Sequence, residues 1–233
     1  MGRLLLLGLV VGGQAPVAAV DVLLVLAVDG SESVSTSRFQ LQMRGYAAAF
    51  RDPEVRRAIV KGGEGRIGVV MFQWTGPTKQ KLMFDWRLID GPVAAEAVAA
   101  EIEGSARLLN YGGTSIRGAV VFAMGCFERA PWAAERRVID VSGDGANNDG
   151  GSMIATRDAA VAAGVVINGL PITSVEPGVD EHYRDEVIGG RGAFMIAVDD
   201  YDDFAEAIRR KLVTEIAGMF PRAAGLRIIT ATH

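Results

Sequence analysis

The feature that most constrains the fold is a nearly continuous apolar run at residues 21–28 (DVLLVLAV), which stops at a polar loop. A strand that is apolar on both faces is typical of a parallel sheet covered by helices on both sides. Helical spacing follows, because Phe39, Met43 and Tyr46 recur every three or four residues until Pro53 ends the helix. The chain therefore opens as a buried strand followed by an amphipathic helix.

The same alternation of strands and helices continues along the chain. Residues 67–74 (IGVVMFQW) and 81–88 predict an antiparallel hairpin whose second strand lies at the sheet edge. The other expected elements are helices at 93–103 and 114–129, a strand at 137–141, a helix ending at 164, strands at 165–170 and 193–198, and a helix at 201–218. We predict an α/β fold: a doubly wound, mostly parallel six-stranded sheet with helices on both faces and one antiparallel edge strand.

Composition excludes several classes of function. The 233 residues, 49% of them hydrophobic, suit one compact domain. The net charge is −4 and the basic residues are scattered, which argues against a nucleic-acid-binding surface. No Gly-x-Gly-x-x-Gly or Walker loop follows the first strand, so nucleotide binding ranks last. Cys126 is the only cysteine, which excludes an intrachain disulfide, and we expect it to be buried.

The first residues have the features of a secretory signal. A lone arginine precedes the apolar run at residues 4–11, which is short for a membrane span, and small residues follow it up to Ala19. We expect cleavage after Ala19, which divides the chain into a signal peptide (1–19), one domain (20–219) and an unassigned tail (220–233). The tail could be a loose extension or a small added strand. The mature protein would be periplasmic or secreted, without a transmembrane segment. A first strand or a retained anchor is the alternative.

Three loops carry oxygen donors: two follow predicted strands, and one precedes the central predicted helix. The loop after the first strand reads Asp-Gly-Ser-Glu-Ser and presents Asp29, Ser31 and Ser33 at alternating positions, so they can face one point. Two glycines precede Thr114 and allow a tight turn that places its hydroxyl at a helix start. Asp144 lies between glycines after a later strand.

Hydroxyl and carboxylate oxygens favour a hard divalent cation. Magnesium takes six oxygens in near-octahedral geometry and keeps several waters, and manganese accepts the same ligands. Softer metals, which prefer thiolate or imidazole, are disfavoured. The alternative is that these segments are three ordinary turns.

With these three loops in this order, the sequence resembles the von Willebrand factor A domain and its metal-ion-dependent adhesion site. The resemblance implies that Ser31, Ser33 and Thr114 bind Mg²⁺ or Mn²⁺ directly. It implies that Asp29 and Asp144 act largely through water and through hydrogen bonds to the hydroxyls. The sixth coordination position would take an Asp or Glu side chain from a protein partner.

The resemblance covers residues from Asp21 to about Gly218, with strands and helices in the family's order. One departure concerns residues 34–37 (VSTS), where integrin-type domains carry paired acids for a second cation. We therefore expect a single metal. Residues 141–148 (VSGDGANN) resemble a branch of exported bacterial members.

Two classes of function compete for this site. A binding module is favoured, because neutral hydroxyls leave the cation electrophilic toward a partner's carboxylate. A metal-dependent hydrolase is the alternative, but it needs a nearby general base that we do not find in the sequence. The only histidines are His182 and His233, and nothing links either to the Ser31 loop as a triad would require. We therefore predict that the protein is not an enzyme.

Asp140 stands out as a carboxylate within an apolar strand, where it needs a partner. Asn168, in the next predicted strand, or an arginine could supply that hydrogen bond.

Other polar residues have ordinary explanations. The acids of residues 199–203 open a helix, so we expect capping rather than a calcium site. Asn147 and Asn148 follow Asp144, and we favour turn-making over contacts that brace the loop or reach a partner. Residues 182–185 predict an exposed helical segment near the same sheet end, with a possible place at the rim.

The signal sequence makes export testable. Produced in a Gram-negative host, the chain should accumulate in the periplasm with Val20 at its amino terminus, because signal peptidase would cut after Ala19. Cell fractionation followed by amino-terminal sequencing measures both properties. Protein that keeps Met1 or Gly2 would contradict the assignment.

Overall fold

The computed structural model describes residues 18–218 and 227–231, and within them the strands form one seven-stranded sheet in the order β3-β2-β1-β4-β5-β6-β7. The strands are β1 (Ala19–Asp29), β2 (Ile67–Trp74), β3 (Gln80–Ile89), β4 (Ala133–Gly143), β5 (Val165–Pro171), β6 (Phe194–Ala197) and β7 (Arg227–Thr230). Neighbouring strands from β2 to β6 are parallel, and β3 and β7 are antiparallel edge strands. The predicted α/β class is confirmed.

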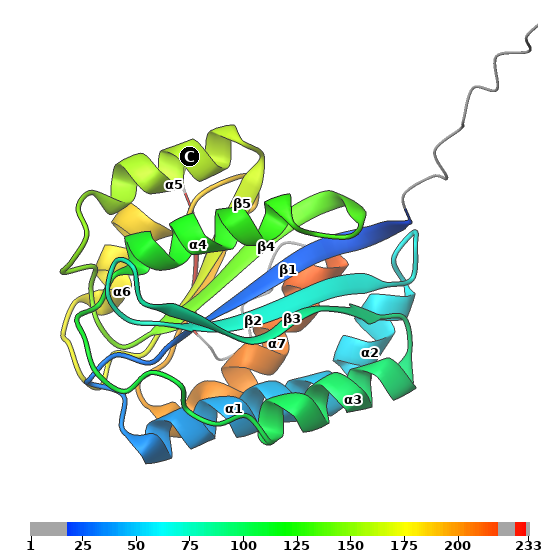
Figure 1. The fold of residues 1–233 in the computed structure, drawn as a ribbon, viewed down its shortest axis with the longest axis horizontal. Helices are drawn as coiled ribbons and strands as arrows, with labels where there is room; N and C mark the ends of the chain where they lie inside the picture. Colours follow the sequence, from blue (N-terminus) through cyan, green and yellow to red (C-terminus); the bar gives the residue numbers. More distant parts are fainter. Residues whose placement is uncertain (1–17, 219–226, 232–233) are drawn as a thin grey trace, which may run out of the picture.

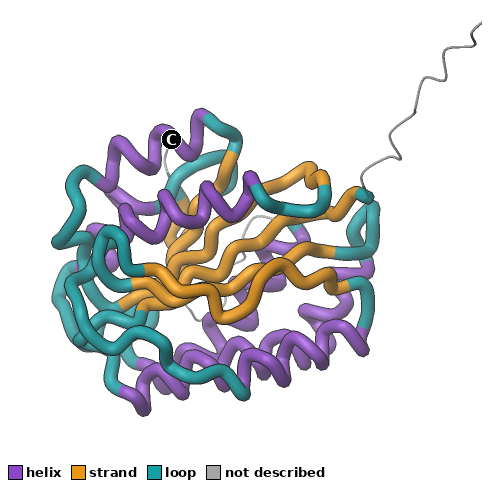
Figure 2. Tube along the Cα trace, in the orientation of Figure 1, coloured by secondary structure: helices purple, strands orange, loops and turns teal. Residues whose placement is uncertain are grey.

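Helices cover both faces of this sheet, as Figures 1 and 2 show. On one face lie α1 (Thr36–Arg51), α2 (Pro53–Val60), α3 (Pro92–Glu103) and α7 (Phe204–Ala217); on the other lie α4 (Ile116–Glu128), α5 (Met153–Ala162) and α6 (Val179–His182). A π-helical turn (Tyr183–Val187) follows α6, and a 3-10 turn (Tyr201–Asp203) precedes α7. Asp200 caps the 3-10 turn by accepting a hydrogen bond from the Tyr201 amide, so the capping prediction is confirmed there.

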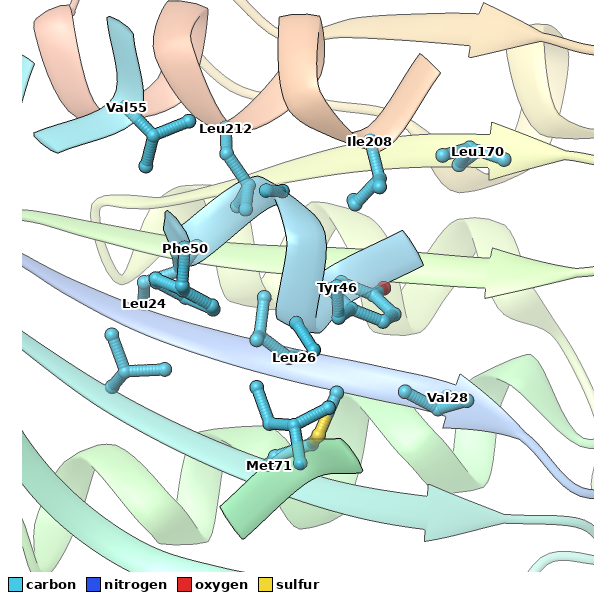
Figure 3. Close-up of a cluster of buried hydrophobic side chains, with 14 of the residues drawn as sticks. Leu24, Leu26, Val28, Tyr46, Phe50, Val55, Met71, Leu170, Ile208 and Leu212 are labelled. Atoms are coloured by element: carbon cyan, nitrogen blue, oxygen red, sulfur yellow. The ribbon is translucent and has the colours of Figure 1, made fainter. Parts of the chain in front are cut away.

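Strand pleating explains why the first strand is apolar throughout. Leu24 and Leu26 point toward α1 and α7, whereas Leu23 and Val25 point toward α4 on the opposite face. Figure 3 shows the first of these two cores, in which Leu24, Leu26 and Met71 of the sheet lie beneath helical side chains. Cys126 is buried in the second core, as expected.

The sheet has one strand more than the six expected. The additional strand, β7, comes from the tail at residues 220–233 and pairs antiparallel with β6, for example through Met195 and Ile229. The four residues of β7 are partly buried or exposed. A strand with so little burial does not need the apolar pattern by which strands are predicted from sequence. Residues 1–17, which include most of the expected signal peptide, lie outside the described part of the chain.

Parallel strands place their carboxyl ends at one edge, where the loops gather (teal, at the left in Figure 2). Of the polar residues predicted from sequence, Asp29, Ser31, Ser33 and Asp144 lie at the ends of β1 and β4, which are adjacent in the sheet, and Thr114 lies between α3 and α4. No helix in residues 18–218 has the length and hydropathy needed to cross a membrane.

A buried charged network joins α7 to the middle of the sheet. The Lys211 ammonium lies 2.7 Å from Asp140 Oδ1 and 2.5 Å from Glu215 Oε1, and all three side chains are fully buried. Asn168 donates to Glu215 Oε1 at 2.9 Å and accepts from the Phe194 amide at 3.0 Å. The expected bond between Asp140 and Asn168 is therefore wrong, although the two residues are register partners.

Two carboxyl groups share one ammonium in this network. Burial raises the pKa of Asp140, and the nearby Lys211 acts in the opposite direction. Burial also raises the pKa of Glu215 to about 7, with Asp140 adding to the shift and Lys211 opposing it. Both shifts favour the protonated form of the two acids, and a proton held by the pair reduces the charge left uncompensated in the core.

Removing the ammonium should destabilise the fold. We expect Lys211→Ala to lower the free energy of unfolding at pH 7 by about 3 to 5 kcal/mol, because two buried acids lose their cation. Urea denaturation measures the change. Arg57→Ala on α2 is the control, since its exposed ion pair with Glu54 should contribute less than about 1 kcal/mol. Equal, small losses in both variants would contradict the role of Lys211.

Candidate cation site

The first loop of the site begins at the last residue of β1. Asp29 is fully buried, and its Oδ1 accepts a hydrogen bond from the Ser31 amide at 2.7 Å. Its Oδ2 is also buried but has no hydrogen-bond partner within residues 18–218 and 227–231. The Ser31 and Ser33 hydroxyl oxygens lie 3.0 Å apart, so the alternation seen in the sequence does place them together.

Asp144 connects this loop to α7. It follows β4 and is fully buried, and its Oδ1 accepts a hydrogen bond from the Ser33 hydroxyl at 2.5 Å. Its Oδ2 accepts another from the Tyr201 hydroxyl at 2.8 Å. Asp144 thus contacts the β1 loop and the start of the final helical segment at the same time.

Thr114 belongs to the same cluster of loops. Its amide donates to Asn148 Oδ1 at 2.9 Å, and its carbonyl accepts from the Asn148 amide at 3.0 Å. Asn147 Oδ1 accepts from the Arg117 amide at 2.9 Å, just inside α4. The two asparagines therefore hold the Thr114 loop against the Asp144 loop, a bracing role that we ranked below turn-making.

The Thr114 hydroxyl faces the Asp144 loop across a glycine. A Cβ atom built on Gly145 would lie 3.2 Å from Thr114 Oγ1, which is tighter than most contacts in proteins. Gly145 thereby leaves room beside this hydroxyl. The structure brings all five predicted residues to one loop cluster, and it records direct contacts among Asp29, Ser31, Ser33 and Asp144.

The electrostatics of the cluster suit a cation. Burial, and then the charge of nearby Asp144, raises the pKa of Asp29 to about 7, although hydrogen bonds from Ser31 lower it. A positive ion between the two acids would reverse this shift, and it would give the unpartnered Asp29 oxygen a charged neighbour. The donors are oxygens of hydroxyls and carboxylates, which hard cations prefer, so the residues fit the ion that the sequence predicts.

The carboxylates alone do not make a metal cluster. Within the described residues, no three His, Cys, Asp or Glu side chains are placed to hold an ion between them. The hydroxyls would have to supply the direct ligands, as the resemblance implies. Ser33 is only partly buried, whereas Ser31 and Asp29 are almost fully buried, so the cluster opens toward solvent at Ser33.

Two tyrosines that were not predicted as site residues lie near the acids. Tyr201, the first residue of the final predicted helix, donates its hydroxyl to Asp144. Tyr183 lies in the segment that we expected to be exposed, yet it is fully buried. Its hydroxyl and Asp29 Oδ2 lie within 2.9 and 3.0 Å of the point where a Gly143 Cβ would stand. A tyrosine beside a helix start gives no signal in sequence that it reaches a loop more than 50 residues away.

The segment after β5 also reaches the Asp144 loop. Glu176 Oε2 accepts a hydrogen bond from the Ala146 amide at 2.9 Å, and His182 Nε2 accepts one from the Asn147 amide at 3.1 Å. The His182 side chain is 14% exposed. The prediction of a solvent-facing helix is therefore wrong for His182 and Tyr183, because His182 accepts the Asn147 amide and Tyr183 is buried in the core.

Exposed apolar side chains and cations surround the cluster. Leu108 and Tyr111, in the loop before Thr114, are 50% and 63% exposed. Arg107 from the same loop donates to the carbonyls of Gly30 and Ser31 at 3.2 and 3.0 Å. The Lys79 ammonium lies 4.4 Å from the centre of the Tyr111 ring. The rim therefore combines apolar area with positive charge.

Several solved structures share the fold of this chain. The chain aligns with proximal thread matrix protein 1 of the mussel byssus at TM-score 0.63 and 15% identity, over 88% of this chain and 49% of that protein. A von Willebrand factor type A protein from Catenulispora acidiphila aligns at TM-score 0.58 and 14% identity, over 84% and 43%. The von Willebrand factor domain of the type V pili tip protein Mfa5 from Porphyromonas gingivalis aligns at TM-score 0.63 and 9% identity, over 88% and 98%.

The chain spans about half the length of the first two proteins, so the likeness to them covers one domain. One structure of the mussel protein has a zinc-occupied metal-ion-dependent adhesion motif, and it aligns at TM-score 0.58 and 17% identity over 87% of this chain and 49% of that one. No curated protein matches the sequence.

A family match covers most of the chain. Residues 19–220 match the family described as "Protein of unknown function (DUF1194)", and this range contains all three loops of the candidate site. The fold and the sequence match agree with the resemblance found in the three loops. The chain belongs to the DUF1194 family and has the von Willebrand factor A fold.

Proposed function

We propose that this protein is a divalent-cation-dependent protein-binding module of the bacterial cell envelope, in which the cation coordinates an Asp or Glu of the partner. The observation that carries the proposal is the contact of Ser33 with both Ser31 and Asp144, in a loop that begins at Asp29, whose buried Oδ2 has no hydrogen-bond partner among the described residues. Polar groups gathered in this way favour a bound cation over an empty cluster.

In the proposed site, the hydroxyls of Ser31, Ser33 and Thr114 hold Mg²⁺ or Mn²⁺. Asp144 orients the Ser33 hydroxyl, Asp29 fixes the backbone of the loop through the Ser31 amide, and the two acids balance the charge of the ion. The bound ion supplies an electrophilic centre with an exchangeable position, and a carboxylate is its preferred ligand from a partner. The chemistry is reversible binding without turnover.

The relatives support a binding role over catalysis. The structures with this fold include a byssus matrix protein and a pili tip protein, and the zinc-occupied motif occurs in the former. The rim described above supports a protein as the partner. Exposed Leu108 and Tyr111 offer apolar contact area, while Arg107 and Lys79 suit an acidic segment.

Tyr201 offers a physical route from the cation to the final helix. It donates to Asp144 and begins the turn that leads into α7. We propose that a change in how Asp144 and Thr114 share the cation, directly or through water, shifts this contact and thereby biases the position of α7.

The competing hydrolase function needs a general base close to the cation. His182 is near the Asp144 loop, but its Nε2 already accepts the Asn147 amide. A chelator distinguishes the two functions: it should release a bound protein from a binding module, and it should stop turnover of a phosphoester by a hydrolase.

Export completes the proposal. The signal at residues 1–19 would deliver the domain at residues 20–219 to the periplasm or the exterior. Val20 pairs with Ala134 of β4 and is almost fully buried, so cleavage after Ala19 would leave most of β1 in the sheet.

Substitutions should separate metal binding from partner binding. We expect Thr114→Ala to keep the fold and to weaken partner binding more than Mn²⁺ binding, because only a loop hydroxyl is lost. Asp144→Ala should weaken both, since Asp144 also orients Ser33. Periplasmic pull-down with and without chelator identifies the partner, and calorimetry then measures both affinities.

The calorimetric titration of Mn²⁺ should saturate at one ion per chain. Thr156→Ala is the control for Thr114→Ala, since the Thr156 hydroxyl donates to the carbonyl of Ser152, the N-cap residue of α5. If Thr114→Ala binds the partner as tightly as the wild type, the assignment of Thr114 is wrong. Saturation at two ions would contradict the single site.

Cation binding should depend on pH through Asp29. Its pKa of about 7 means that protons compete with the ion, so the affinity for Mn²⁺ should fall by up to about tenfold per pH unit below pH 7 and level off above it. Calorimetric titrations between pH 5.5 and 8.5 measure this slope. An affinity independent of pH across that range would contradict the role of Asp29.

The metal-free protein should show the opposite trend. Because the folded-state pKa of Asp29 lies above its ordinary value of 3.8, the folded chain holds a proton that the unfolded chain releases. The stability contributed by this group is therefore complete below about pH 4 and is lost as pH rises toward 7. Urea denaturation at a series of pH values measures the free energy of unfolding. The loss of stability between about pH 4 and pH 7 that is due to Asp29 should be absent in Asp29→Asn.

A further inference from the structure

Glu176 is an acid at the cation site that the three sequence loops do not include. It follows β5 in the chain, and its Oε2 accepts a hydrogen bond from the amide of Ala146, two residues after Asp144. This is the one hydrogen bond recorded for its side chain among the described residues. The carboxylate is thereby fixed on the Asp144 loop.

The same carboxylate lies close to the Thr114 hydroxyl. A Cβ atom built on Gly145 would be 3.2 Å from Glu176 Oε2 and 3.2 Å from Thr114 Oγ1. The small space in front of Gly145 is thus bordered by a predicted direct ligand and by an acid of the chain itself. Glu176 is partly exposed, whereas Asp29 and Asp144 are fully buried, so among these three acids it is the one that reaches solvent.

We propose that Glu176 is a further residue of the cation site, which raises the affinity for the divalent ion through its charge and stands where the partner's acid must approach. This inference rests on the proposed function. The three acids are not placed to hold an ion between them, so Glu176 acts across the gap beside Thr114, through space or through water. The number of charged groups around a hard cation is a main determinant of its affinity.

A third acid has a consequence for the partner. Asp29 and Asp144 together balance the charge of a divalent ion, and Glu176 adds one negative charge beyond that balance, beside Thr114. An acidic side chain from a partner then meets repulsion from Glu176 as well as attraction from the ion. Glu176 therefore raises the affinity of the site for the ion and lowers the affinity of the loaded site for the partner's acid.

The test uses Mn²⁺ alone, with the full chain at pH 8. Glu176→Gln keeps an oxygen that can accept the Ala146 amide but removes the charge. Glu181→Gln is the matched control, since Glu181 lies in the same segment and is exposed, with no recorded bond to the Asp144 loop. Electron paramagnetic resonance of free Mn²⁺ gives the dissociation constant, and thermal unfolding without metal checks the fold.

We expect Glu176→Gln to bind Mn²⁺ roughly three- to tenfold more weakly than the wild type, with a difference that shrinks at high salt. Glu181→Gln should match the wild type, and metal-free melting temperatures should agree for all three proteins. Equal Mn²⁺ affinity in Glu176→Gln and Glu181→Gln would overturn the proposal and leave Glu176 as a brace. If the wild type does not bind Mn²⁺, the cation site itself fails, so the two failures are distinguishable.

Discussion

The two hydrogen bonds accepted by Asp144 hold the candidate site together. One comes from Ser33, in the loop after β1, and the other comes from Tyr201, at the start of the segment that leads into α7. Asp144 is fully buried, so each bond it loses would leave a buried acceptor unsatisfied. The position of the Ser33 hydroxyl and the start of the final helix therefore depend on the same carboxylate.

Much of this arrangement could be predicted from the sequence, because its causes are local. The apolar run of β1 requires a covered parallel sheet, and such a sheet brings the carboxyl ends of β1 and β4 to one edge. Asp29 ends β1, and Ser31 and Ser33 follow within four residues in a turn in which Asp29 accepts the Ser31 amide, so their convergence depends on local contacts.

What could not be predicted depends on contacts between distant parts of the chain. Lys211 and Tyr201 look like ordinary helix residues, and only the docking of α7 reveals that they meet Asp140 and Asp144. Glu176 lies in a loop without any motif, and its contact with the Ala146 amide spans 30 residues. Strand β7 is short and half exposed, so neither periodicity nor hydropathy marks it.

Two of these long-range contacts join β4 and the loop after it to the final helical segment. Asp140 of β4 meets Lys211 of α7, and Asp144, directly after β4, meets Tyr201 in the turn that precedes α7. Apolar side chains such as Ile208 and Leu212 make up much of the remaining α7 interface, as Figure 3 illustrates. Arg136 of β4 also donates to the carbonyls of Glu215 and Ile216 at the end of α7. Apolar surfaces tolerate small sliding movements, whereas ion pairs and hydrogen bonds each require one geometry. These polar contacts therefore fix where the final helical segment lies on the sheet, and a cation that competes for Asp144 acts on one of them while the Lys211 network and Arg136 hold the others.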